Sequence, residues 1–157
     1  GLGAGNFYKT EDNLMIESEL TFGEGVHLKV ADGKGVFINA NFTIAGTASN
    51  PVTIEGLSTG TDSWSGILLE HPASANFSCD YGIIDNGGSN IMFGSTEKAN
   101  LVVKGTGSIS CTNTTFSNSN GWGVVILSGA TSYDFQDATY NNTFTSNASG
   151  DFLNNAK

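Results

Sequence analysis

The sequence predicts an all-β solenoid whose chain winds through about five or six stacked coils. Apolar residues are mostly β-branched or aromatic, and they occur in short runs between turns rich in glycine and asparagine. No window of a dozen residues carries the periodic apolar pattern of an amphipathic helix. In addition, two apolar series recur at similar intervals along the chain, as they do in repeat structures whose coils bury one another.

Strands and turns follow one another from residue 14 onward. Residues 1–13 show little pattern, and we expect them to lead into the fold or to cap it. The following stretch is divided by glycines and by the Asn50–Pro51 turn into short strands. Those expected strands are residues 14–16, 20–22, 26–30, 36–38, 42–44 and 52–54. A chain of 157 residues fits one domain, 1–157, and a repeat domain of this kind can also belong to a longer polypeptide.

The first apolar series aligns one core position of four successive coils: Ile54, Ile84, Phe116 and Phe144. Extended without gaps, the alignment places Cys79 beside Cys111 on neighbouring strands. The two cysteines can form a disulfide or stack as buried thiols, and the sequence leaves both open. Residues 87–98 are the longest insertion into the pattern, so we expect an inserted loop there.

The second series aligns five tetrapeptides that begin at residues 35, 66, 100, 123 and 151. Alternation along a strand directs one apolar residue of each tetrapeptide outward. These outward residues are Phe37, Leu68, Val102, Val125 and Leu153. Such a stripe predicts contact with another chain, with a neighbouring domain or with a loop of the same protein. The same register places Lys104 over Glu70 and predicts a surface ion pair.

Three motifs carry a resemblance to a known family: residues 20–26 (LTFGEGV), 46–52 (GTASNPV) and 64–67 (WSGI). They resemble, in the same order, the motifs LTIEPGV, GTxxNPI and WxGI of bacterial extracellular proteins of the pectin-lyase-like superfamily. Segments 81–88, 99–103 and 113–118 are similar to that family's later coils. The resemblance covers most of residues 14–154 and implies a single-stranded right-handed parallel β-helix that is secreted or displayed on the cell surface.

The charge pattern disfavours some partners. The formal net charge is −9, and all six basic residues are lysines. Nucleic acid and anionic membranes require clustered cations, so both are poor partners for this chain. No apolar run approaches the roughly 20 residues of a membrane-spanning helix, so direct membrane insertion is not expected. The expected partners are a glycan or another protein surface.

The resemblance by itself does not select a function, because the superfamily includes lyases, hydrolases, adhesins and modules without known activity. Its lyases use a basic residue, often arginine, and usually Ca²⁺, whereas its hydrolases use clustered aspartates with a histidine motif. Here arginine is absent, and His27 and His71 lack such neighbours. We therefore expect a non-catalytic structural, adhesive or carbohydrate-binding module. The alternative is a polysaccharide lyase or glycoside hydrolase that acts on an acidic polysaccharide.

Aromatic residues supply the candidate glycan surface, because sugars stack on flat exposed rings. Trp64 and Trp122 occupy the same place before a Gly-Ile or Gly-Val strand, and they could line a shallow surface with Asp62, Tyr81 and Asn120. Alternatively, each indole fills the corner of its own coil. No cofactor is expected apart from a candidate Ca²⁺ ion, which could bridge Glu55 and Asp85 on adjacent coils. The alternative is that these carboxylates are solvated and point apart.

One further ladder suggests a minor alternative function. The first series places Thr53, Ile83, Thr115 and Thr143 together on the outside of one sheet. Regular threonine ladders are typical of ice-binding solenoids, although Ile83 interrupts this one.

Overall fold

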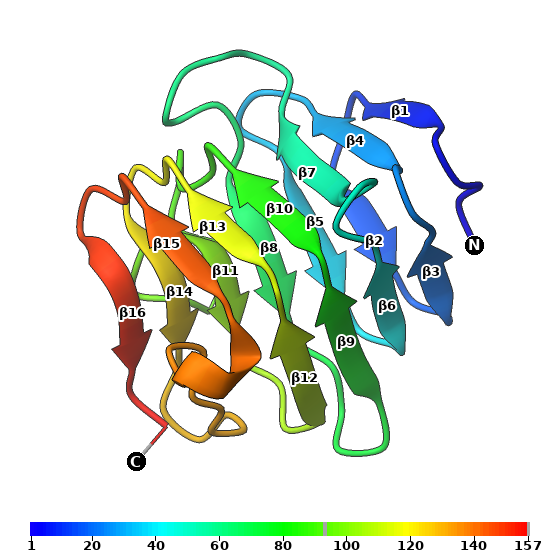
Figure 1. The fold of residues 1–157 in the computed structure, drawn as a ribbon. Helices are drawn as coiled ribbons and strands as arrows, with labels where there is room; N and C mark the ends of the chain where they lie inside the picture. Colours follow the sequence, from blue (N-terminus) through cyan, green and yellow to red (C-terminus); the bar gives the residue numbers. More distant parts are fainter. Residues whose placement is uncertain (93, 157) are drawn as a thin grey trace.

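The computed structural model describes residues 1–92 and 94–156 (Figure 1). The strands of these residues form three sheets, in which every neighbouring pair is parallel. Successive strands visit the three sheets in turn, so that the chain forms a stack of coils (Figure 1). The predicted all-β parallel solenoid is therefore confirmed.

Sheets B and C take one strand from each coil, and sheet A takes one from each of the first four coils. Sheet B contains β1 (Phe7–Thr10), β4 (His27–Val30), β7 (Val52–Gly56), β10 (Gly82–Asp85), β13 (Thr115–Ser117) and β15 (Thr143–Thr145). Sheet C contains β2 (Leu14–Ile16), β5 (Gly35–Ile38), β8 (Gly66–Leu69), β11 (Ala99–Val103), β14 (Trp122–Ile126) and β16 (Gly150–Asn154). Sheet A contains β3 (Leu20–Phe22), β6 (Phe42–Ala45), β9 (Asn76–Asp80) and β12 (Ser108–Thr112).

The coils run from sheet C through sheet A to sheet B. In the last complete coil, a segment with the short 3₁₀ helix η1 (Ala138–Tyr140) follows β14 in place of a sheet A strand. Residues 1–13 lead into this stack, since β1 is the first strand of sheet B and Leu2 forms a parallel bridge with Phe22. The described residues contain no helix long and apolar enough to cross a membrane.

Both apolar series keep the register that the sequence predicts. Ile54, Ile84, Phe116 and Phe144 are paired along sheet B. On sheet C, Ile67 pairs with Leu101, which pairs with Val124. These residues point into the coil, where the apolar core is continuous from one coil to the next. Full burial of one such side chain stabilises the fold by about 1.5–3 kcal/mol relative to exposure.

Asparagine residues shape the corners on both sides of sheet B. Asn113 and Asn118 flank β13 in the left-handed backbone region, with φ of 50° and 52°. Asparagine tolerates this conformation because its short side chain can hydrogen-bond locally. Each amide donates to an aspartate of the coil before, Asn113 to Asp80 and Asn118 to Asp85, both at 2.8 Å. These contacts give the asparagine-rich corners a structural role.

A buried asparagine side chain forms hydrogen bonds with backbone groups inside one of these corners. The Asn100 side chain is fully buried. Its Oδ1 accepts from the Gly87 amide at 2.8 Å, and its Nδ2 donates to the carbonyls of Ile84 at 3.1 Å and Ser117 at 2.8 Å. A buried backbone group that lacks a hydrogen bond destabilises the fold by about 1–3 kcal/mol. The Asn100 side chain avoids this penalty at the corner.

Candidate functional site

The two tryptophans, predicted to be equivalent, are not. Trp64 lies three residues before Ile67, whereas Trp122 lies two residues before Val124, and Ile67 and Val124 share one register through Leu101. An offset of one residue reverses the face of a strand to which a side chain points. Trp64 therefore turns into the core, and Trp122 packs against the outer face of sheet C.

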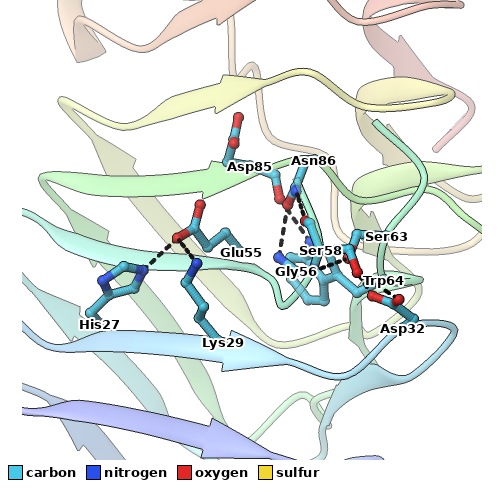
Figure 2. A network of polar contacts seen from close by, with 10 residues as sticks. All are labelled: His27, Lys29, Asp32, Glu55, Gly56, Ser58, Ser63, Trp64, Asp85 and Asn86. Carbon is cyan, nitrogen blue, oxygen red and sulfur yellow. Dashed lines mark hydrogen bonds and ion pairs between the residues drawn. The ribbon is translucent and has the colours of Figure 1, made fainter. Parts of the chain in front are cut away.

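Burial rules out Trp64 as a sugar-stacking ring. The side chain is 0% exposed, and its Nε1 donates to the Asp85 carbonyl at 2.7 Å (Figure 2). This contact joins the corner after β7 to the end of β10. The structure supports the alternative prediction, in which the indole fills the corner of its coil.

The other candidate glycan residues do not form one surface. Asp62, Trp64 and Asn120 belong to corners between sheets B and C, whereas Tyr81 lies between β9 and β10, at the corner between sheets A and B. These corners are at opposite ends of the sheet B strands. Because Trp64 is also buried and Trp122 is only half-exposed, the five residues are not brought together as a glycan site.

Glu55 and Asp85 are paired in register, but their carboxylates bind different partners. Glu55 Oε1 lies 2.6 Å from His27 Nε2 and 3.3 Å from Lys29 Nζ. Asp85 Oδ1 accepts from Ser117 Oγ at 2.6 Å and Asn118 Nδ2 at 2.8 Å. Figure 2 shows Glu55 turned toward His27 and Lys29, with the Asp85 carboxylate pointing the other way.

These pairings do not fit a bridging Ca²⁺. Calcium needs six to eight oxygen ligands, whereas Glu55 is bound to nitrogen donors of the preceding coil and Asp85 to donors of the following one. Among the described residues, no three histidine, cysteine, aspartate or glutamate side chains are grouped to hold a metal ion. The structure supports the alternative in which the two carboxylates point apart.

The outward apolar stripe of sheet C is covered by the protein's own inserted loop. Leu68, Val102 and Val125 are fully buried, and they pack with Met92 from residues 87–98. Phe37 and Leu153 are partly buried at the two ends of this cluster. The loop is also held to the corner of sheet C, because the Ser89 amide donates to the Trp64 carbonyl at 2.9 Å. Of the three predicted contacts for the stripe, the structure contains the one with the protein's own loop.

The two histidines have different surroundings. His71 is fully buried, its Nε2 lies 3.1 Å from the Ser108 carbonyl, and its Nδ1 has no hydrogen-bond partner among the residues that the structure describes. Burial lowers the pKa of His71 below its usual value, because the charged imidazolium is poorly solvated there. His27 is half-exposed on β4, where its ring meets the Phe7 ring edge-on at 5.0 Å.

The exposed face of sheet B carries a cluster that sequence analysis did not identify. We call Phe7, His27, Lys29 and Glu55 the sheet B cluster. Phe7 is 60% exposed, and the three polar residues are joined through Glu55 Oε1. The signal that could have revealed this cluster is the register of β1, β4 and β7, which pairs Phe7 with His27 and Lys29 with Glu55. An aromatic ring beside hydrogen-bonding groups of both charges can bind a polar, partly apolar ligand.

Other predicted pairs hold. Lys104 Nζ lies 2.6 Å from Glu70 Oε1, which confirms the expected ion pair. Thr53, Ile83, Thr115 and Thr143 are in register on sheet B, as predicted. In that ladder, Thr115 Oγ1 lies 2.8 Å from Thr143 Oγ1.

Comparison with known proteins finds no matching family model, curated protein sequence or solved structure. The structure itself therefore establishes the parallel solenoid. Membership of the pectin-lyase-like superfamily and a bacterial origin stay predictions from the sequence motifs.

Proposed function

We propose that the protein is a non-catalytic structural or adhesive module of the extracellular space or cell surface, and that it binds carbohydrate through the sheet B cluster. The observation that carries this proposal is the exposed Phe7 ring beside the His27–Glu55–Lys29 contacts. The opposite case is sheet C, whose outer apolar residues are already buried in a cluster with Met92 of the inserted loop.

The chemistry of the cluster suits a sugar. One face of a sugar ring is rich in C–H groups and can lie on the Phe7 ring, whereas its hydroxyls can bond to charged side chains. Lys29 and Glu55 are each about three-quarters buried, with side-chain exposures of 24% and 23%. Their positions are therefore restricted before a ligand binds, which reduces the entropy lost on binding.

Two residues that could perform acid–base chemistry elsewhere, His71 and Asp85, have structural positions. His71 lies inside the protein, and Asp85 accepts hydrogen bonds from Ser117 and Asn118. The sheet B cluster is where histidine, lysine and glutamate side chains meet, so catalysis on an acidic polysaccharide is the alternative function to test there. Ice binding is disfavoured, since Ile83 and the Glu55–Asp85 pair interrupt the hydroxyl array of sheet B.

A glycan array probed with three proteins tests the binding proposal. We expect the wild type to bind a subset of glycans, and Phe7→Ala to weaken that binding about tenfold through loss of the ring contact. Met15→Ala is the matched control, because Met15 is an apolar residue of the first strands that is 50% exposed, but on sheet C. Glycan binding that survives in Phe7→Ala, or that is absent from the wild type, would overturn the proposal. Release of unsaturated or reducing sugars from acidic polysaccharides would instead establish the enzyme alternative.

A further inference from the structure

Cys79 and Cys111 occupy equivalent places on neighbouring strands of sheet A. They are paired in register between β9 and β12, and both are free thiols in this structure. Both point into the coil, with exposures of 2% and 0%. Adjacent parallel strands lie about 4.8 Å apart, which falls within the roughly 4.4–6.8 Å between the Cα atoms of disulfide-bonded cysteines. The strand register thus gives a Cα separation that is compatible with a cross-link between the third and fourth coils.

We propose that Cys79 and Cys111 are a disulfide site, and that the bond forms during folding, before the C-terminal segment closes over sheet A. This inference is independent of the proposed carbohydrate binding. The bond would join two coils at sheet A, which ends after β12 within the described residues.

The timing follows from what covers Cys111 in the folded protein. Tyr133, which comes from the segment after β14, accepts a hydrogen bond from the Cys111 amide at 3.0 Å and donates one to the Cys111 carbonyl at 2.9 Å. On the inner side, Cys79 Sγ lies 3.1 Å from Thr114 Oγ1. Burial raises the pKa of the Cys111 thiol well above its usual value, so the nucleophilic thiolate is scarce once the protein is folded.

The chemistry is thiol–disulfide exchange with an external disulfide. One cysteine thiolate attacks a sulfur of that disulfide, forming a mixed disulfide and releasing one thiol. The second cysteine thiolate then attacks the protein sulfur of the mixed disulfide, forming the Cys79–Cys111 bond and releasing the second thiol. The two cysteines give up two protons and two electrons, and the external disulfide is reduced to two thiols.

Refolding with oxidised glutathione tests the proposal. We expect the refolded wild-type monomer to be lighter than the reduced protein by two hydrogen atoms and to show no free thiol after unfolding without reductant. We also expect it to melt roughly 5–10 °C above the reduced protein. Retention of both thiols, or cross-linking between chains, would overturn the proposal.

A matched surface pair tests the timing. Ser78 and Ser110 are paired on the same two strands, one residue from the cysteines, and they point outward. The control is S78C/S110C combined with C79S/C111S. Oxidised glutathione added to the folded, reduced proteins should oxidise this control pair while the native Cys79 and Cys111 stay reduced. Equal oxidation of both pairs would contradict bond formation before closure. Should the control fail to fold, comparing oxidation of the native pair in folded wild type and during refolding answers the same question.

Discussion

Sheets B and C are built on the same plan but have opposite outer faces. Each takes one strand from every coil, and in each the inward residues form continuous ladders. Outside, sheet B carries half-exposed threonines and charged side chains, whereas the central residues of sheet C are buried in a cluster with Met92 of the inserted loop. Stacking therefore depends on the inward residues, and the outward residues decide whether a sheet meets water or a second layer of protein.

The difference is visible in the strands themselves. β8 and β11 are buried at every position, while β10 alternates between buried and half-exposed residues. A parallel strand covered on both faces has nearly continuous apolar sequence, and one that faces water on one side alternates. Strands β8 and β11 of sheet C are thus covered on both faces, whereas the outer face of β10 in sheet B is half-exposed.

The largest expected effect is the loss of stability when an outward side chain of sheet C is truncated, compared with the same kind of truncation on sheet B. We expect Leu68→Ala on sheet C to lower the free energy of unfolding by about 2–5 kcal/mol, because the side chain is fully buried beneath the loop. Ile83→Ala on sheet B, where the outward residue is half-exposed, should cost less than about 1 kcal/mol. Urea denaturation measures both values. Equal losses would show that the two outer faces are covered alike.

The loop that covers sheet C can be tested without changing either sheet. Met92→Ser should destabilise the protein by about 1–3 kcal/mol and speed hydrogen exchange in β8 and β11, because Met92 is buried in the same apolar cluster as Leu68 and Val102. Ile91→Ser is the control, since the Ile91 side chain is next to Met92 in the sequence but is 55% exposed. If the two variants behave identically, Met92 does not anchor the loop.

The histidines extend the comparison to pH, because His71 follows β8 of sheet C and His27 belongs to β4 of sheet B. The folded protein holds the pKa of His71 below the usual 6.5. As the pH falls below about 6.5, the unfolded chain therefore binds a proton at His71 more readily than the folded protein does. The free energy of unfolding decreases there by at most about 1.4 kcal/mol per pH unit for one proton. Above that pH, the contribution of His71 to stability is fully present.

Urea denaturation between pH 4 and pH 8 measures this dependence, with the range set by the usual histidine pKa of about 6.5. His71→Gln should remove the contribution of His71 to the change of unfolding free energy with pH. His27→Gln is the matched substitution on sheet B. A profile unchanged in His71→Gln would show that this buried ring does not titrate on unfolding.

The smallest effect is expected at the ion pairs of sheet B. Glu55→Gln removes the charge that pairs with His27 and Lys29, whose side chains are 34% and 24% exposed. Partly solvated pairs contribute about 0–1 kcal/mol, and salt screens them. The difference from wild type in urea denaturation should therefore shrink at high salt. A large loss that is independent of salt would indicate that Glu55 stabilises the sheet through packing.

The sequence was informative where chemistry repeats from coil to coil. Ile54, Ile84 and Phe116 could be aligned because equivalent core positions need similar residues, and the paired strands confirm that alignment. Trp64 and Trp122 were predicted to be equivalent from similar neighbours, and that prediction was wrong because one residue of register reverses a side chain. The sheet B cluster was missed because Phe7 lies in a segment without repeat pattern, so its pairing with His27 could not be inferred.

Alternation and repetition along the chain were sufficient to predict the parallel solenoid and the register of its core ladders. These features arise from local alternation and from repetition, both of which are present in a linear chain. The folded structure was needed to show that Met92 packs in the outer cluster of sheet C, that Trp64 is buried and that the carboxylates of Glu55 and Asp85 bind different partners. Those outcomes depend on the path of a non-repeating loop and on side-chain directions at corners, which are set by contacts between residues far apart in the chain.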